Sequence, residues 1–232
     1  MRIAAIADFH CRVNSTIAPL LDGVQDQADL LLLAGDLTDT GLPAEMAVLL
    51  NELKQLSLPI LAILGNHDHE NDHSDELCTM LADTGIMVLE GNVVEVQGIG
   101  FLGAKGFCGG FDDKLVQPFG ERAIKDFIRI GIDESVRLEN SVAKLQTPKK
   151  VAVLHYSPVK QTLEGESPEL FPFLGSSRLA SALDRHGVDV IVHGHAHHGS
   201  PEGRTAGGIP VYNVCRFVQQ RCCNRPYLVF QV

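Results

Sequence analysis

The feature that most constrains this chain is a set of short apolar runs, each closed by residues able to bind a metal. The clearest run, Leu30–Ala34, continues through Gly35 to the carboxylates Asp36 and Asp39. An unbroken apolar run of this length, ended by a glycine, is typical of a strand buried on both faces of a parallel sheet. Ligands of open α/β sheets bind beyond the carboxyl ends of the strands, so we expect Asp36 to lie at a binding site.

The same pattern recurs at four other places in the sequence. These mostly apolar runs, with the residues that end them, are 1–7 with Asp8 and His10, 59–64 with Asn66, His67 and Asp68, 150–154 with His155, and 188–192 with His193, His195 and His197. Carboxylate, amide and imidazole groups are ligands of divalent metals, and no thiolate is among them. A single such residue is often only a turn or capping residue. Five strand ends of this kind predict one shared site.

The segments between these runs predict helices that alternate with the strands. An apolar stripe within 17–24 has helical spacing after a capping Asn14 or Ser15, and further helices are expected over 41–56 and 74–83. This alternation predicts a parallel sheet with right-handed crossovers and helices on its faces. Short β runs after residue 86, with turns near 92 and 98, predict the start of a second sheet.

The second half of the chain contains one helical region and two irregular segments. Residues 121–145 have helical periodicity, and Gly131 is expected to break them into two helices. The glycine-rich segment 103–118 does not match a phosphate-binding P-loop. Residues 156–175 contain three prolines and little periodicity. The first segment is therefore predicted to be a flexible rim loop, and the second a loop or a lid over the site. Substrate selection is expected to depend on both.

Charge limits the partners of this chain. It has 29 acidic and 19 basic residues, a formal charge of -10, which argues against nonspecific binding to nucleic acid or membrane surfaces. A small phosphorylated substrate is compatible with this negative charge, because bound cations can invert the sign of the local field. With 45% hydrophobic residues among 232, the chain can bury a sizeable core, and we expect a single domain over residues 1–232.

The sequence also carries expectations about compartment. No apolar stretch approaches the roughly 18 residues of a membrane-spanning helix, and Asp8 and His10 interrupt any signal-peptide core at the N-terminus. The six cysteines have no zinc-type C-x-x-C spacing. They are interpreted as reduced thiols of a cytoplasmic protein.

Taken in order, the residues at the strand ends spell D-x-H, G-D-x-x-D, G-N-H-D, a lone His and G-H-x-H, within residues 8–197. This ordered set resembles the calcineurin-like metallophosphoesterase superfamily. The resemblance implies an α/β fold, a four-layer α/β/β/α sandwich of two mixed sheets flanked by helices, with a dimetal site at the strand ends. In its short, single-domain form, the chain is similar to the bacterial and archaeal phosphodiesterase-like members of the superfamily, including relatives of cyclic-nucleotide phosphodiesterases.

The resemblance also implies a role for each motif residue. It implies a first metal held by Asp8, His10 and His197, a second held by Asn66, His155 and His195, and a bridging Asp36. A carboxylate can hold two ions about 3.5–4 Å apart, as two-metal phosphoryl sites require. The mixed donors suit two Mn, Fe or Zn ions. His67 matches the residue that protonates the leaving group or stabilises phosphoryl charge, and Asp68 is expected to orient it.

Other polar residues near the motifs are given supporting roles. Asp39 is expected to orient a metal ligand without binding the metal itself. His193 and His198 flank G-H-A-H and are expected to be structural or rim residues, because the motif already fills its ligand positions. Arg12 is the nearest cation to the first motif and is expected to lie at the surface.

The implied activity is attack of a metal-bound hydroxide on phosphorus, in line with the leaving group, on small phosphodiester or nucleotide-type substrates. One alternative is a phosphomonoesterase or phosphoprotein phosphatase of the same superfamily. The protein phosphatases carry a phosphate-gripping arginine where this chain has Thr40, which disfavours that alternative. Another is a non-catalytic binding scaffold, which the complete motif set disfavours. The lack of a basic stripe disfavours a nuclease that acts on long nucleic acid.

Overall fold

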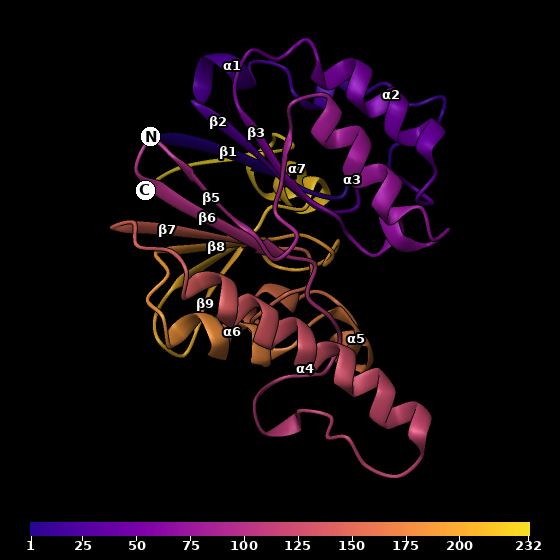
Figure 1. The fold of residues 1–232 in the computed structure, drawn as a ribbon, viewed down its shortest axis with the longest axis vertical. Helices are drawn as coiled ribbons and strands as arrows, with labels where there is room; N and C mark the ends of the chain where they lie inside the picture. Colours follow the sequence, from indigo (N-terminus) through magenta and orange to yellow (C-terminus); the bar gives the residue numbers. More distant parts are fainter.

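The computed structural model describes residues 1–232, which form two mixed sheets packed face to face between two layers of helices (Figure 1). The first sheet has the strand order β11-β1-β2-β3-β4, and the second has the order β5-β6-β7-β8-β10-β9. In Figure 1, α1, α2 and α3 lie on one side of this sandwich, and α4, α5 and α6 lie on the other. The four-layer α/β/β/α architecture implied by the motifs is confirmed.

The first sheet and its helices are formed mainly by the N-terminal third of the chain. The elements are β1 (Arg2–Ile6), η1 (Ala18–Leu20), α1 (Val24–Gln27), β2 (Leu30–Ala34), α2 (Pro43–Leu53), β3 (Ile60–Ile63), η2 (His67–His69), α3 (Ser74–Asp83) and β4 (Met87–Val88). They are joined by β11 (Leu228–Gln231), which pairs antiparallel with β1. Every residue of β2 is buried, because alternate side chains face the helices and the second sheet. The central apolar run is therefore a strand covered on both faces, as predicted.

The second sheet and its helices follow in the chain. The elements are β5 (Val93–Val96), β6 (Ile99–Ala104), η3 (Asp112–Lys114), α4 (Arg122–Val142), β7 (Lys149–Leu154), η4 (Lys160–Leu163), η5 (Pro168–Leu170), α5 (Phe171–Leu174), α6 (Ser177–Asp184), β8 (Val190–His193), β9 (Glu202–Arg204), β10 (Pro210–Asn213) and α7 (Arg216–Cys223). The predicted hairpin is β5 and β6, and β6, β7, β8 and β10 run parallel. None of the helices has the length and apolarity needed to cross a membrane.

Two helix predictions are wrong, for physical reasons that the structure shows. In the apolar stripe within 17–24, Ile17, Leu21 and Val24 are buried and Leu20 is partly buried, but the segment forms only the 3-10 turn η1 and the short helix α1. Gly23 separates them with a left-handed φ of 69°. Conversely, Gly131 does not break α4. It lies where the helix passes a loop, and a Cβ there would be 2.8 Å from the carbonyl oxygen of Cys108.

The sheets bring the predicted strand ends to one edge of the sandwich. β1, β2 and β3 are mutually parallel, and β7, β8 and β10 are mutually parallel in the other sheet. Ala7 at the end of β1 forms a bridge with Cys215 after β10, which joins the two sheets at this edge. In Figure 1, α7 lies at the same edge, between the two helix layers. The edge is therefore built from segments far apart in the sequence.

Candidate metal centre

Four of the predicted site residues have a backbone conformation that non-glycine residues rarely adopt. Asp8, His10, Asp36 and His195 have φ values of 63°, 46°, 50° and 68°. Left-handed backbone costs an L-residue about 1–2 kcal/mol, and such residues gather at functional sites. Each one follows the end of a strand and turns the chain sharply. The strained turns aim the side chains at the edge of the sandwich.

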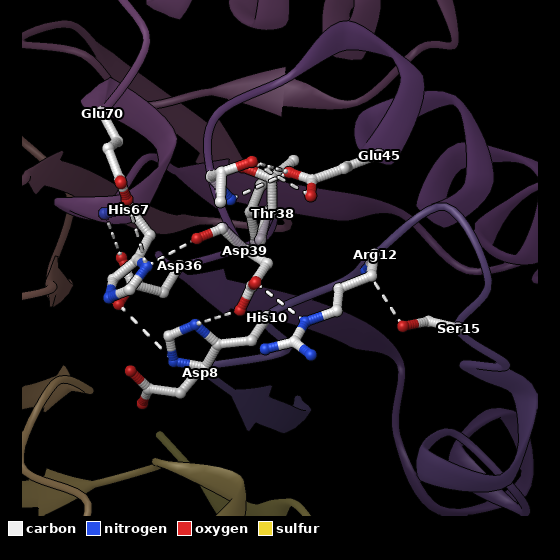
Figure 2. Close-up of polar contacts among 12 residues, drawn as sticks. Asp8, His10, Arg12, Ser15, Asp36, Thr38, Asp39, Glu45, His67 and Glu70 are labelled. Atoms are coloured by element: carbon white, nitrogen blue, oxygen red, sulfur yellow. Dashed lines mark hydrogen bonds and ion pairs between the residues drawn. The ribbon is translucent and has the colours of Figure 1, made fainter.

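The first group of converging side chains is Asp8, His10, Asp36 and His197, whose potential ligand atoms lie within 4.8 Å of one another. We name it the open cluster, because the side chains of His10 and His197 are 12% and 34% exposed. His197 Nε2 lies 3.2 Å from Asp8 Oδ1 and 3.3 Å from His10 Nε2. Figure 2 shows His10 pointing toward Asp36, at 3.8 Å between Nε2 and Oδ2. The open cluster combines strand ends from both sheets.

The second group, Asp36, His155 and His195, is named the enclosed cluster because Asp36 and His155 are almost completely buried. His155 Nε2 lies 3.2 Å from Asp36 Oδ1 and 2.9 Å from Asn66 Oδ1. On the other side of the ring, Nδ1–H donates to the Ala34 carbonyl at 2.9 Å. That bond turns Nε2 toward the cluster, as the outer hydrogen bond of a metal-binding histidine does.

Electrostatics within the two clusters favour an added cation. Burial alone would lower the pKa of His155, but the carboxylates of Asp36 and Asp8 raise it to about 9. Burial and the charge on His155 lower the pKa of His195 to about 3. Asp8 and Asp36 are buried, and their ion-pair partners are all histidines, with no lysine or arginine among them. Two buried carboxylates lie beside imidazoles that can lose their proton and bind a metal through nitrogen. This donor set fits metal ions that accept both nitrogen and oxygen ligands.

The motif glycines are explained by lack of space beside the carboxylates. A Cβ on Gly65 would lie 2.1 Å from Asp36 Oδ1, and one on Gly194 would lie 2.7 Å from Asp8 Oδ2. Neither contact is possible without displacing the carboxylate. G-N-H-D and G-H-x-H therefore begin with glycine because the backbone passes directly beside Asp36 and Asp8.

His67 lies beside the open cluster and is held by backbone groups. Its Nδ1 is 2.6 Å from the carbonyl oxygen of Asp39, and its ring is perpendicular to that of His10 at 4.5 Å between centroids. Its backbone N–H donates to Asp36 Oδ1 at 2.9 Å (Figure 2). Because Nδ1 is bonded to a carbonyl, it carries the proton, and Nε2 is left for other contacts.

The prediction that Asp68 orients His67 is wrong. The Asp68 carboxylate is fully buried and accepts hydrogen bonds from the backbone N–H groups of Leu37, Thr38 and Gly65 and from the Thr38 hydroxyl. Burial and the nearby Asp36 charge raise the pKa of Asp68 to about 6. Asp68 thus ties together the loops that follow β2 and β3, and the carbonyl of Asp39 orients His67.

The remaining flanking residues have structural contacts. His193 is fully buried, with Nε2 bonded to the Thr162 hydroxyl and Nδ1 to the Gly194 carbonyl, both at 2.8 Å. It joins the G-H-A-H turn to the segment 156–175. Arg12 is exposed and pairs with Asp39 at 2.8 Å. The backbone N–H of His198 donates to a carboxylate oxygen of Glu166 at 2.7 Å.

The two segments predicted to be loops, 103–118 and 156–175, pack against each other. The second contains the short helices η4, η5 and α5 and is not irregular throughout. The N–H of Gly109 donates to the Pro172 carbonyl at 2.8 Å, and that of Gly110 donates to the Gly175 carbonyl at 3.0 Å. Cys108 Sγ lies 3.3 Å from the carbonyl oxygen of Phe173. These contacts join the two segments, and the second segment meets the enclosed cluster, since the centroid of the Tyr156 ring lies 4.4 Å from that of His195.

Sequence reasoning missed the contribution of α7. Arg216 Nε donates to the Asp8 carbonyl at 2.8 Å, and Arg221 donates to the carbonyls of His197 and Gly199. The Phe217 ring lies 4.9 Å from that of His197. These residues follow the last motif by about twenty positions and belong to no recognisable pattern. Only the position of α7 at the sheet edge reveals them.

Comparison with known proteins gives three findings. A protein-family model described as calcineurin-like phosphoesterase matches residues 1–199. A protein of Synechococcus sp. described as a probable cyclic nucleotide phosphodiesterase is 36% identical over 90 residues, covering 34% of this chain and about a third (35%) of the relative's length. The crystal structure of phosphopantetheinyl hydrolase from Mycobacterium tuberculosis superimposes with a TM-score of 0.72 at 16% identity, covering 98% of this chain and 95% of the other. At that identity the superposition shows a shared fold.

Proposed function

The chain belongs to the calcineurin-like phosphoesterase family, and we propose that it is a two-metal phosphodiesterase that acts on small phosphodiester or nucleotide-type substrates. Family membership makes it a metal-dependent hydrolase of phosphoric esters. The observation that carries the proposal is the convergence of two potential metal-binding clusters on one shared carboxylate, Asp36. Two ions bridged by a carboxylate are the arrangement that two-metal phosphoryl chemistry uses.

We assign the metal ligands as follows. Asp8, His10 and His197 would hold the first ion, Asn66, His155 and His195 the second, and Asp36 would bridge them. The contacts within the open and enclosed clusters support this division, since each potential ligand lies beside the others of its set. Mixed carboxylate, amide and imidazole donors suit Mn, Fe or Zn. Bound there, the ions would supply charge neutralisation on the phosphoryl oxygens and activation of water.

His67 is proposed as the catalytic acid or charge stabiliser. Because its Nδ1–H is bonded to the Asp39 carbonyl, Nε2 is available to face a substrate oxygen. A positioned imidazolium can donate a proton to the leaving group or a hydrogen bond to the phosphoryl group. Asp68 acts indirectly, by fixing the loops that carry Asp36 and Asn66. It is a positioning residue.

The position of Thr40 supports a diester preference over phosphoprotein phosphatase activity. Its hydroxyl and backbone N–H both donate to Glu45 at the start of α2. The side chain at this position is thus turned toward the helix and supplies no cation to grip a phosphate dianion. A monoester carries more charge than a diester, so the lack of this cation weighs more heavily against monoesters.

A substrate panel with added Mn(II) tests the proposal. We expect metal-dependent hydrolysis of bis(4-nitrophenyl) phosphate or cyclic nucleotides with a higher kcat/KM than that of 4-nitrophenyl phosphate. A higher kcat/KM for the monoester would overturn the diester assignment. Failure to hydrolyse any member of the panel with Mn, Fe or Zn would favour a non-catalytic scaffold. Binding to single-stranded DNA should be weak at every salt concentration, because the chain has no basic stripe.

A further inference from the structure

Phe217 is an exposed aromatic residue directly beside the open cluster. It is 37% exposed, although its ring centroid lies 4.9 Å from that of His197 and 6.4 Å from that of His10. Two nearby residues at the start of α7, Cys215 and Val218, are by contrast fully buried. Phe217 therefore contributes apolar surface to the site and not to the core.

The backbone that carries Phe217 is fixed to the same strand end that carries Asp8. The N–H of Arg216 donates to the Ala7 carbonyl at 3.1 Å, and the N–H of Ala7 donates to the Val214 carbonyl at 3.0 Å. Arg216 Nε donates to the Asp8 carbonyl at 2.8 Å. Because the backbone that carries the ring is fixed before any ligand arrives, little backbone freedom is lost when a group packs against the ring.

The Arg216 guanidinium lies over the Phe217 ring, 4.1 Å from its centroid. It is half-buried, and its only side-chain hydrogen bond is the one to Asp8. A cation over an aromatic face is attracted by the ring quadrupole, so Arg216 holds the ring in place beside the cluster. Phe217 stays 37% exposed beside these contacts, so part of the residue is accessible to a ligand.

We propose that Phe217 forms a binding subsite for a planar aromatic group of the substrate, such as a nucleobase. The inference rests on the proposed phosphoesterase function, because it places the phosphate at the two clusters. A group joined to that phosphate through a short spacer such as a ribose would then pass His197 and meet the exposed part of the ring. Planar aromatic groups gain affinity from stacked or edge-on contact with such a ring, whatever the base.

Two ligands that differ only in the base give a direct test. AMP and ribose 5-phosphate share the sugar and the phosphate, and their affinities for the Mn(II)-loaded protein can be measured by calorimetry. In the unaltered protein we expect AMP to bind about tenfold more tightly. In Phe217→Ala that ratio should fall to about one, through loss of AMP affinity, while the affinity for ribose 5-phosphate is unchanged.

Two further variants separate stacking from packing. Phe217→Tyr keeps the aromatic ring and should retain the preference for AMP. Phe119→Ala removes another exposed ring, 64% exposed, from the segment just before α4, which lies far from α7 in Figure 1. It should leave the ratio as it is in the unaltered protein. Metal content and melting temperature are recorded for each variant to show that the clusters and the fold persist.

Several outcomes would overturn the subsite. They are equal affinities of AMP and ribose 5-phosphate in the unaltered protein, an unchanged ratio in Phe217→Ala, or a parallel loss of both affinities, which would mean that Phe217 only supports His197. These failures are distinct from failure of the proposed function. Hydrolysis of bis(4-nitrophenyl) phosphate without discrimination between the ligands removes the subsite alone, whereas discrimination without hydrolysis removes the phosphodiesterase assignment alone.

Discussion

The open and enclosed clusters share Asp36 but differ in the solvent access and the hydrogen bonding of their histidines. In the enclosed cluster His155 is fully buried and held on both sides, by the Ala34 carbonyl and by Asn66. In the open cluster His197 is a third exposed, and it contacts the Asp8 carboxylate, His10 and the Phe217 ring. Outer hydrogen bonds that orient a ligand raise metal affinity. We therefore expect the enclosed cluster to bind its ion more tightly and the open cluster to exchange its ion and meet the substrate.

The largest effect is expected from His155→Ala, which removes the central ligand of the enclosed cluster. We expect kcat/KM for bis(4-nitrophenyl) phosphate at saturating Mn(II) to fall at least about 100-fold, because Asp36 loses its partner and the second ion its anchor. His73→Ala is the matched control, since His73 is exposed and pairs only with Glu76 at the start of α3. Retention of most of the activity in His155→Ala would remove the basis for the enclosed cluster.

Asp68→Asn tests how both clusters depend on the same buried anchor. The amide would present hydrogens to backbone donors that now face a carboxylate, so we expect the free energy of unfolding to fall by about 3 kcal/mol. Urea denaturation of the metal-free protein measures this change. The pH profile of kcat/KM should keep its shape, because Asp68 does not contact His67. A shift of the acid-limb pKa would restore the orienting role that the sequence predicted.

His197→Ala should affect the open cluster selectively. With one ligand gone, the Mn(II) concentration that gives half-maximal activity should rise about tenfold. The metal content after gel filtration should fall from about two ions toward about one, since the enclosed cluster keeps all its ligands. Elemental analysis and an Mn(II) titration measure the two quantities. Loss of both ions together would show that the clusters are not independent sites.

The smallest effect concerns pH. The pKa of His155 is raised from 6.5 to about 9, so its protonated form stabilises the metal-free fold below pH 6.5, and this contribution is lost as pH rises through 9. A bound cation must displace that proton, so metal binding strengthens over the same window. We expect the difference in Tm between Mn(II)-loaded and metal-free protein to widen by about 5 °C from pH 6.5 to 9. In His155→Ala this increase in the Tm difference should disappear. If the increase persisted in that variant, another titratable group would be its cause.

The difference between the clusters also shows where sequence reasoning succeeded. Leu30–Ala34 predicted a strand covered on both faces, and the family motifs implied the four-layer fold that the structure has. Reasoning failed where a neighbour in sequence was taken for a neighbour in space. Asp68 follows His67 in the chain, but its carboxylate points the other way, to the backbone of Leu37 and Thr38. Gly131 was expected to break a helix, but it lies inside α4, at a point where the backbone of Cys108 passes too close for a Cβ.

The sequence by itself determined that the chain has buried strands ending in metal-binding groups, because apolar runs closed by glycine and polar ligands are local features. It also determined which residue types could meet an ion. Only the tertiary structure decided which ligands are enclosed and which are open, and it alone placed Phe217 beside His197. Solvent access and the distance between rings depend on how two sheets and a late helix pack, and no spacing along one chain records that packing.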